Sequence, residues 1–533
     1  MTMLIIEHGH IFIGGYYMVK VEKRHTCTII HNYEMGDVPF IEKMFSVWDR
    51  LYHRYYLYGI YYDKKNKDLY LPSGMDDYFI YRNFYGDIFE KRNPDEYASI
   101  DNKILLKSAP RDDTQIEAIK FCTGLSPYEK NRNLSQLSLN LPTGKGKTYV
   151  AIAVFAFYRI KTMMITSTID WLYQWKEKIL EYTNLTKDEV YIIAGKASIV
   201  KLFNGMHDHT KIKFFLCSHD TLKAYATANG WESVHELFKT LKIGIKIYDE
   251  AHLYFDNTMM IDNYTDVWKT YYLTATPMKS NVNEDKIYKR CYEKVPKISM
   301  FDEDNDPHTE YLAIFFNSRP NPMQVSDCQN AYGFDRIKYE NYLVTRPNYF
   351  KLLRILMEII RCRLSPEGKC LIYIGTNYAI QATYNWLHYY FRNLSIGIFS
   401  SLVDKDSKRD QLNNTIILTT TKSAGAALDI PGLEITMILD EPFKSKQIAI
   451  QTLGRTRAKN TLYIDIVDTG FKSLRYYYNS KLPAFQKYAT NCKQLSISDA
   501  ELDSRVKEID YNEMKRLEEK HKPNIHVIEF KEK

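Results

Sequence analysis

The 533-residue chain lacks every cysteine arrangement that would indicate a metal or disulfide scaffold. None of its eight cysteines forms a CxxC pair, and their spacings suit neither a zinc site nor a disulfide framework. We therefore expect reduced and mostly buried thiols in an intracellular protein. These residues are Cys27, Cys122, Cys217, Cys291, Cys328, Cys362, Cys370 and Cys492.

A long hydrophobic run and a signal segment are also missing. The longest apolar run, near residues 149–158, is too short to span a bilayer. The N-terminus shows no charged region followed by a sustained apolar stretch. These absences predict a soluble protein without a membrane partner, located in the cytoplasm of the host cell if a phage encodes it.

The composition allows several folded domains and a polyanionic partner. The chain is long enough for three or four domains, and 45% of its residues are hydrophobic, as in soluble proteins with real cores. The net charge is +7, from 72 basic and 65 acidic residues. This balance is compatible with nucleic acid as a partner, but it equally fits a solvated surface.

The pattern of predicted strands and helices changes near Pro110. Before it lie several short strand-like runs, such as 10–21 and 57–62, and after it strands alternate with helical periods, the pattern of parallel-sheet domains. A helical period at 499–520 and a strand candidate at 524–530 follow. We expect that helix to pack on the preceding block, with a partner-binding arm as the alternative. The predicted limits are 1–104, 105–294, 295–480 and 481–533.

The clearest motif is Pro-Thr-Gly-Lys-Gly-Lys-Thr, between a predicted strand at 137–141 and a predicted helix at 149–159. Strand, glycine-rich turn and helix form the context of a phosphate-binding loop. Backbone N–H groups of such a turn surround phosphate oxygens, and the start of the helix favours the same anion. We therefore expect an ATP site at this loop.

Individual loop residues take individual roles in this site. Gly144 and Gly146 let the backbone turn inward, Lys147 supplies charge to the β and γ phosphates, and the Thr148 hydroxyl can ligate Mg²⁺. Leu141 replaces the first glycine of the GxxxxGK[ST] pattern. The remaining candidates for nucleotide contact in the loop are Thr143 and Lys145.

A pair of carboxylates predicts the second half of the site. The strand-like run at 243–248 leads directly into Asp249-Glu250-Ala-His252. Asp249 can hold Mg²⁺ through water, and Glu250 can orient or deprotonate the attacking water. His252 is expected near the γ-phosphate or a second domain. Such a string alone is usually a solvated turn, but after a phosphate loop it indicates a nucleotide triphosphatase.

Gln115 is the candidate for adenine recognition. It lies in Arg111-Asp-Asp-Thr-Gln-Ile-Glu117, shortly before the phosphate loop. A side-chain amide offers both the donor and the acceptor that adenine requires. We expect Gln115 and Arg111 to contact the nucleotide; the alternative is an exposed polar residue at a helix start.

With Thr274-Ala-Thr-Pro277 and Gln451-Thr-Leu-Gly-Arg-Thr-Arg457, the ordered motifs resemble superfamily 2 helicases and translocases, in their DEAH-containing, XPB-like branch. The resemblance covers about 107–468. It implies an α/β fold with two tandem RecA-like parallel-sheet domains that sandwich ATP and grip a nucleic-acid strand. We add a small N-terminal α+β domain and a helical C-terminal tail.

The resemblance also assigns strand-binding and coupling residues. Residues 165–175 resemble motif Ia, which touches the strand backbone; the alternative is a loop with a buried Trp. Motif III, linking ATP to the strand, corresponds to Thr274 and Thr276, and motifs IV and V to 375–376 and 419–429. The implied nucleic-acid contacts are Thr168, Trp171, Gln174, Thr376, Thr420 and Lys422, and the implied nucleotide contacts are Gly425 and Asp429.

Motif VI departs from its usual form. The branch has QxxGRxxR, whereas this chain has Gln451, Arg455 and Arg457, with Ala458 at the last position. An arginine here is implied to reach the γ-phosphate when the domains close, which couples chemistry to motion. Either Arg455 or Arg457 can be that arginine.

The N-terminal segment resembles the leader of phage UvsW-type helicases over about sixty residues, through Trp48-Asp-Arg50, Gly59-Ile-Tyr-Tyr62 and 68–74. It interleaves aromatic and basic residues, which can grip nucleic acid by stacking and phosphate contact. Tyrosines on short strands can equally form a core. The segment comprises Arg50, Tyr52, His53, Arg54, Tyr55, Tyr56 and Tyr58.

These observations predict an ATP- and Mg²⁺-dependent DNA helicase or translocase, a monomer that remodels forks, junctions or R-loops in phage or viral DNA repair, recombination and replication. The alternatives are an RNA helicase, a viral transcript-release ATPase, or the motor of a nuclease or restriction complex. A non-catalytic ATP-binding scaffold would predict decay at Lys147, Glu250 or Arg455, and all three are intact.

Overall fold

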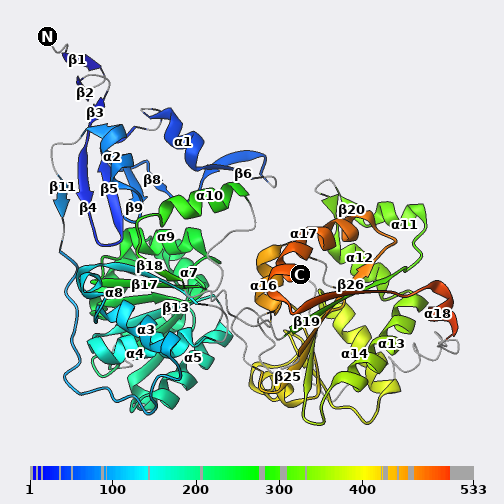
Figure 1. Ribbon diagram of the computed structural model, residues 1–533. Coiled ribbons are helices and arrows are strands. Elements are labelled where there is room, and N and C mark those ends of the chain that lie inside the picture. Colours follow the sequence, from blue (N-terminus) through cyan, green and yellow to red (C-terminus); the bar gives the residue numbers. More distant parts are fainter. Residues whose placement is uncertain are drawn as a thin grey trace. The chain divides into compact units, whose positions relative to one another are not determined.

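The computed structural model divides the chain into two compact units, Met1–Asp302 and Glu303–Lys533 (Figure 1). The structure describes some residues by their backbone alone. These are the described residues up to 18, and residues 85, 89–91, 170, 405–406, 446–447, 451 and 504. The described residues are 4–7, 10–13, 16–34, 36, 38–49, 52–85, 89–91, 93–141, 145–167, 169–204, 208–274, 282–299, 309–330, 333–421, 423, 430–440, 443, 445–453 and 461–504.

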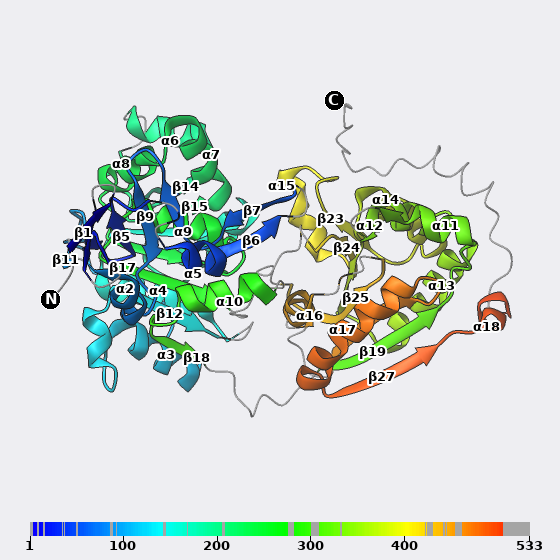
Figure 2. The same ribbon diagram turned by 90° about the horizontal axis from the view of Figure 1, so that it is seen from above.

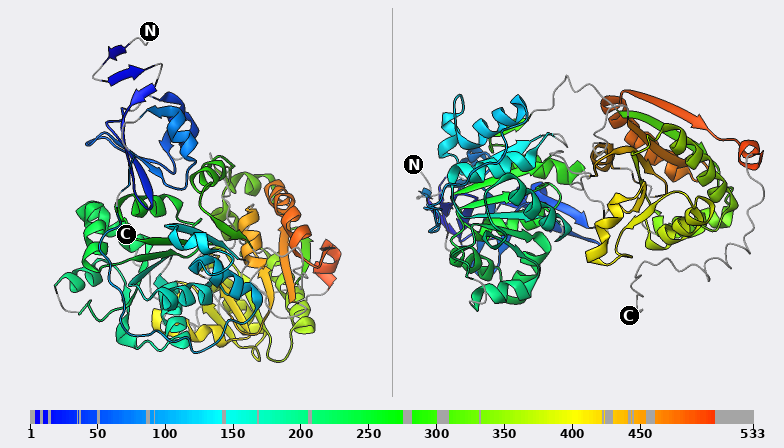
Figure 3. Two further views of the ribbon diagram at one scale, coloured as in Figure 1. Left: turned by 60° about the vertical axis from the view of Figure 1, so that its left-hand side comes forward. Right: turned by 90° about the horizontal axis from the view of Figure 1, so that it is seen from below.

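The first unit begins with a small α+β domain, drawn in blue in Figures 1 and 3. Its main sheet has five strands in the order β11-β4-β5-β9-β8, beside a separate β6–β7 hairpin. The elements are β1 Leu4–Glu7, β2 His10–Ile13, β3 Tyr16–Met18, β4 Lys20–Lys23, β5 Cys27–His31, α1 Pro39–Phe45, β6 Ser46–Asp49, β7 Arg54–Leu57, β8 Tyr61–Asp63, β9 Asp68–Pro72, α2 Asp77–Asn83, β10 Phe84–Tyr85 and β11 Phe89–Lys91.

Two strand predictions for this domain were too coarse. The run 10–21 divides into β2, β3 and β4, and the run 57–62 is interrupted between β7 and β8. The interruption has a local cause, because Gly59 has φ +76°, a left-handed conformation that no strand residue adopts. The chain therefore turns at Gly59 and enters a different sheet.

The first parallel domain follows in the same unit. Its seven strands are all parallel and have the order β14-β15-β13-β16-β17-β12-β18. The elements are α3 Asp113–Thr123, β12 Gln136–Asn140, α4 Lys147–Tyr158, β13 Thr162–Thr166, α5 Ile169–Tyr182, β14 Val190–Ile193, α6 Lys196–Phe203, β15 Phe214–Ser218, α7 His219–Asn229, α8 Glu232–Thr240, β16 Ile245–Tyr248, α9 Phe255–Tyr264, β17 Lys269–Thr274, α10 Val282–Cys291 and β18 Lys297–Ser299.

Both faces of this sheet are buried, which explains its continuous apolar strands. Met164 packs into the core formed with α3, α4 and α5. Its neighbours Met163 and Ile165 pack into the core on the other face, with α6, α7 and α8. Alternate side chains of a strand point to opposite faces, so a parallel sheet covered by helices on both sides needs apolar residues at every position.

The N-terminal domain and the first parallel domain share one hydrophobic core. Tyr58 of the N-terminal domain packs on Phe255 of α9, with ring centroids 5.2 Å apart. The same cluster contains Ile287 and Cys291 of α10. An added Cβ at Gly59 would lie 2.9 Å from the Cys291 sulfur, so the two domains approach too closely for any side chain there. The contact between the N-terminal domain and the first parallel domain is therefore a packed hydrophobic interior.

The second unit repeats the topology of the first sheet. Its seven parallel strands have the order β23-β24-β22-β25-β26-β19-β27. Numbered along each domain, both sheets read 3-4-2-5-6-1-7. The elements are β19 Thr309–Phe316, α11 Pro322–Asp327, β20 Gln329–Asn330, β21 Gly333–Phe334, α12 Arg336–Leu343, α13 Pro347–Arg363, β22 Lys369–Tyr373, α14 Asn377–Tyr390, β23 Ile396–Phe399, α15 Lys405–Lys408, β24 Ile416–Thr419, β25 Leu433–Ile438, α16 Lys446–Leu453, β26 Thr461–Asp468, α17 Lys472–Tyr488, β27 Asn491–Ser496 and α18 Asp499–Ser504.

This repetition shows two tandem RecA-like domains, the predicted fold class. The internal repeat was invisible as sequence similarity because each position needs only an apolar side chain of suitable size. Among the described residues, no helix is long and apolar enough to cross a membrane.

The edges of both sheets lie beyond the predicted domain limits. β18 pairs with β12, so the first sheet continues past 294. β27 pairs with β19, so the second sheet continues past 480. α18 then packs on the second unit through the buried Leu502, and Asp503 pairs with Lys351 at 2.8 Å. The start of the tail therefore belongs to the second unit, and the remaining predicted helix and strand at 505–533 lie outside the described residues.

Candidate nucleotide site

The phosphate loop requires a glycine at Gly146 for two physical reasons. Gly146 is the N-cap of α4 and has φ +84°, in the left-handed region that L side chains rarely adopt. A Cβ atom there would overlap the side-chain amide nitrogen of Gln115. The backbone of the loop and the predicted adenine-binding residue are thus in direct contact, as expected for parts of one site.

Lys147 and Glu250 come together at the carboxyl edge of the first sheet. Lys147 is the first residue of α4 after β12, and Glu250 follows β16. The Lys147 Nζ lies 3.7 Å from a Glu250 carboxylate oxygen and donates to the Leu141 carbonyl oxygen at 3.1 Å. Glu250 has φ +48°, which is uncommon for a residue with a side chain and is found preferentially at functional sites. The loop lysine and the candidate catalytic carboxylate are therefore neighbours.

Asp249 is a buried carboxylate held by a tryptophan. The indole nitrogen of Trp175 donates to an Asp249 oxygen at 2.9 Å. Burial and the adjacent Glu250 charge raise the pKa of Asp249 to about 6, while the Trp175 hydrogen bond and the Lys147 charge oppose that rise. Trp175 is a site residue that sequence reasoning missed. The two residues are 74 positions apart, and the only available signal was that Trp175 ends the motif Ia string.

His252 connects the carboxylate motif to the end of the neighbouring strand. Its Nδ1 lies 2.7 Å from the hydroxyl of Thr274, the last residue of β17, and 3.4 Å from a Glu250 oxygen. The His252 ring is fully buried. A histidine nitrogen shared between a hydroxyl and a carboxylate can change partner when either neighbour moves. This arrangement fits the predicted coupling role of Thr274.

Gln115 is buried at the start of α3, and its side chain already has a structural partner. Its carbonyl oxygen accepts from the Arg111 backbone N–H at 2.7 Å, while its own N–H caps onto Asp112 at 2.9 Å. A glutamine amide has two N–H donors and two acceptor lone pairs, so one bond to its oxygen does not use up the groups that adenine would need. The Arg111 side chain is exposed and pairs with Asp112 at 2.9 Å.

Trp175 gives a prediction about pH dependence. The indole N–H stabilises the ionised form of Asp249, so Trp175→Phe should raise the pKa of Asp249 further above 6. The acidic limb of the pH–rate profile for ATP hydrolysis is therefore expected to move to higher pH, with a severalfold loss at neutral pH and recovery in alkaline buffer. Trp268→Phe, at a tryptophan of the same domain that packs on Tyr97 and Tyr158, is the control. An equal loss at every pH would contradict this role.

The two residues predicted to hold Mg²⁺ are Thr148 and Asp249. Thr148 is the second residue of α4, and Asp249 is the buried carboxylate at the end of β16. A hydroxyl and a carboxylate suit Mg²⁺, which takes few protein ligands and keeps water and phosphate oxygens. Among the described residues no group of three or more His, Cys, Asp or Glu side chains forms a metal cage. The donor set therefore fits a nucleotide-bound Mg²⁺.

The predicted strand-contacting residues differ in exposure. Trp171 is buried in α5, so its side chain supports the motif Ia loop, while Gln174 is half-buried. The Thr376 hydroxyl caps α14 by accepting from the Ala379 N–H at 3.2 Å. The Thr420 hydroxyl accepts from the Ser423 N–H at 2.9 Å, shaping the turn after β24. All four roles in nucleic-acid contact stay predictions.

Several predicted site residues cannot be placed. Gln451 lies in α16, and the structure describes the backbone of this residue but not its side chain. The predicted residues outside the described part of the chain are Thr143, Gly144, Thr168, Thr276, Lys422, Gly425, Asp429, Arg455 and Arg457. Lys145 is described, half-exposed, and contributes its charge near Asp112.

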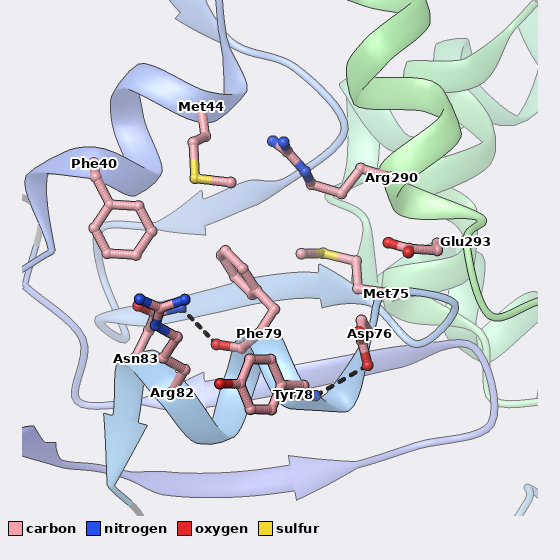
Figure 4. A pocket seen from close by; sticks show the side chains of 10 residues that line it. All are labelled: Phe40, Met44, Met75, Asp76, Tyr78, Phe79, Arg82, Asn83, Arg290 and Glu293. Carbon is pink, nitrogen blue, oxygen red and sulfur yellow. Dashed lines mark hydrogen bonds between the residues drawn. The ribbon is translucent and has the colours of Figure 1, made fainter.

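A separate cavity of about 450 Å³ lies between the N-terminal domain and α10 (Figure 4). Phe40 and Met44 of α1, Phe79 and Arg82 of α2, and Arg290 of α10 contribute to its wall. Of the predicted nucleotide and strand contacts that the structure describes, none lines it. The cavity is thus distinct from the Lys147–Glu250 site.

Comparison with known proteins agrees with this site. Residues 109–279 match the family described as "Type III restriction enzyme, res subunit". A segment of 42 residues is 45% identical to the DNA 3'-5' translocase XPB2 of Sulfurisphaera tokodaii. That segment is 8% of this chain and spans only 10% of the relative's length.

Solved structures give matches of low identity. Dbp5 of S. cerevisiae, bound to RNA and ADP BeF3, is 13% identical with a TM-score of 0.46, covering 77% of this chain and 97% of that one. UvsW of T4 is 13% identical with a TM-score of 0.34, covering 90% and 99%. A putative HsdR subunit fragment of a type I restriction enzyme from Vibrio vulnificus YJ016 is 13% identical with a TM-score of 0.47, covering 73% and 69%.

The family match spans the phosphate loop, the Asp249–Glu250 pair and Thr274, which the structure assembles at one edge of one sheet. The second sheet has the same strand order as the first, while the motif roles predicted for the second unit stay predictions. Over 109–279 the chain is therefore similar to this family, and over 42 residues it is similar to a DNA translocase.

Proposed function

We propose that the protein is an ATP-dependent DNA translocase or helicase that remodels branched DNA. The observation that carries this proposal is the assembly of Lys147, Asp249 and Glu250 at the carboxyl edge of the first of two sheets with identical strand order. Ligands of open parallel sheets bind at this edge. Duplication of the domain gives a two-part motor, in which one part hydrolyses ATP and both hold the strand.

Each residue of the site has a chemical task in this proposal. Lys147 neutralises phosphate charge, and Glu250 orients and deprotonates the attacking water. Thr148 and Asp249 would hold Mg²⁺, which supplies charge neutralisation between the phosphates. The His252–Thr274 contact transmits the state of Glu250 to the strand β17 and the segment that follows it. Arg455 and Arg457 keep their predicted role at the γ-phosphate as part of the proposal.

The similarity to XPB2 of Sulfurisphaera tokodaii favours DNA over RNA. The matching 42-residue segment belongs to a protein named as a DNA translocase. The net charge of +7 suits any polyanion. The contacts predicted for this family address the strand backbone, so no base sequence is preferred.

The proposal is tested by steady-state ATP hydrolysis of the full chain, alone and with single-stranded DNA, duplex DNA, a four-way DNA junction or single-stranded RNA. We expect the largest stimulation with branched or single-stranded DNA and none in Lys147→Ala. Stimulation by RNA alone would transfer the assignment to RNA remodelling or transcript release. Hydrolysis indifferent to every nucleic acid would contradict the proposal.

A further inference from the structure

The β6–β7 hairpin displays aromatic rings on a face that no described residue of the first unit fully covers. Trp48 is 45% exposed, Tyr52 65% and Tyr55 69%. Trp48 and Tyr55 are direct cross-strand partners, with ring centroids 4.9 Å apart. Figure 2 shows β6 and β7 side by side, extending as a blue hairpin from the N-terminal domain. Such large rings normally find a covering partner, so their joint exposure indicates a contact surface.

The opposite face of the hairpin is anchored. Val47 and Tyr56, the next cross-strand pair, turn inward; Val47 is buried and both belong to the core shared with α9 and α10. Where the hairpin leaves that core, the Tyr58 N–H donates to the Phe45 carbonyl oxygen at 2.7 Å. The outward rings are therefore held on a rigid base, which lowers the entropy cost of binding a partner through them.

The basic groups of the hairpin lie at its tip. There the Arg54 guanidinium lies 5.3 Å from the Tyr52 ring centroid, and His53 lies beside Trp48. Arg54 is the cross-strand partner of Asp49, whose carboxylate accepts from the Tyr52 N–H. On the inward side, burial together with Asp256, Glu284 and Asp49 raises the pKa of Tyr56 to about 12. A phosphate backbone can therefore meet a basic group at the tip, beside the exposed rings.

We propose that Trp48 and Tyr55 stack on unpaired bases of a DNA strand at the boundary between single and double strand, with Arg54 beside the phosphates. This inference rests on the proposed function and extends it to a second contact region in the N-terminal domain. Paired bases within a duplex are already stacked on each other, so only unpaired bases can lie on exposed rings. Base–aromatic stacking is tolerant of sequence, as a motor requires.

The hairpin has a direct connection to the nucleotide site. Tyr58, at its base, packs on Phe255, which begins α9 three residues after His252. A strand held by the hairpin would therefore be fixed to the same core as the Asp249–His252 segment. This gives the stacked bases a fixed position relative to the site of ATP hydrolysis.

The test is a binding titration of the full chain with a fluorescein-labelled single-stranded oligonucleotide and with its blunt duplex, at several salt concentrations. For Trp48→Ala/Tyr55→Ala we expect about tenfold or greater loss of affinity for the single strand, because each stack contributes about 1–3 kcal/mol. Binding of the blunt duplex should change little. The salt slope should stay unchanged, because no phosphate contact is removed, whereas Arg54→Gln should reduce it.

Two further variants separate stacking from folding. Trp48→Phe/Tyr55→Phe keeps the ring faces and should restore most of the affinity. Tyr78→Ala/Tyr81→Ala removes two exposed tyrosines of α2 in the same domain and should bind like the wild type. Unchanged single-strand affinity in the Trp48→Ala/Tyr55→Ala variant would overturn the inference. The exposed rings would then be assigned to contact with a protein partner. If the wild type itself bound no DNA and showed no stimulated hydrolysis, the proposed function would fail first.

Discussion

Glu250→Gln is expected to bind ATP with nearly the wild-type affinity and to hydrolyse it at least about a hundredfold more slowly, the range of a lost general base. Glutamine keeps the size and a hydrogen-bonding oxygen but cannot take a proton from water. The Lys147 Nζ, 3.7 Å from the carboxylate, loses an ionic partner and stays available to the phosphates. Single-turnover hydrolysis beside equilibrium binding of a fluorescent ATP analogue measures both quantities.

The control for this substitution is Glu293→Gln, an exposed carboxylate on the same unit. It should leave both quantities unchanged. Wild-type turnover in Glu250→Gln would show that the catalytic carboxylate is wrongly assigned. Loss of ATP binding together with turnover would instead make Glu250 a structural residue of the loop.

Lys147→Ala is expected to weaken ATP binding by about tenfold to a hundredfold, since hydrogen bonds to charged groups contribute about 1.5–3 kcal/mol. Hydrolysis should fall below detection, because the charge developing on the transferred phosphoryl group also loses its partner. The substitution additionally leaves the buried Glu250 without the charge of Lys147. Titration with the fluorescent analogue measures the loss of binding, and thermal unfolding without nucleotide measures the effect on stability.

A matched lysine controls for general charge effects. Lys120 lies on α3 of the same domain and pairs with Glu117 at 3.6 Å on the surface. Lys120→Ala should retain nucleotide binding and turnover. If Lys147→Ala bound ATP as tightly as Lys120→Ala, the loop at 141–148 would not be the phosphate site.

Sequence alone predicted the site best where chemistry constrains a short segment. The strand, turn and helix around Lys147 lie within two residues of their predicted positions, because a phosphate loop needs that local order. The Trp175–Asp249 bond was not predictable, since it joins residues 74 positions apart. The identical strand order of the two sheets does not follow from local patterns, and only the family resemblance implied two RecA-like domains.

The N-terminal domain contains the largest difference between pattern and structure. Its tyrosines were open to two interpretations, core or nucleic-acid contact, and the structure divides them between both environments. Tyr58 is buried against Phe255, whereas Tyr52 and Tyr55 are exposed on the hairpin. Strand alternation produces this division, but the turn at Gly59 had to be placed before the inward face was known.

A buried polar group also joins the N-terminal domain to the first parallel domain. Asp262 accepts from the hydroxyls of Tyr248 and Tyr272 at 2.7 and 2.6 Å and pairs with Lys246 at 2.5 Å. Its backbone oxygen accepts from the Thr26 hydroxyl at 2.7 Å. Tyr248 immediately precedes Asp249, so the same network fixes the carboxylate strand and the N-terminal sheet. A displacement of the N-terminal domain would therefore also displace Tyr248 and the adjacent Asp249 of the candidate nucleotide site.

A motor driven by the Lys147–Glu250 site is tested most directly by displacement of a labelled strand from a forked DNA duplex by the full chain, with wild type and Glu250→Gln side by side. We expect time-dependent displacement that requires ATP and wild-type Glu250, with Glu250→Gln binding the fork but leaving it intact. Displacement by Glu250→Gln at the wild-type rate, or an intact fork in the presence of vigorous DNA-stimulated hydrolysis, would contradict a motor driven by this site.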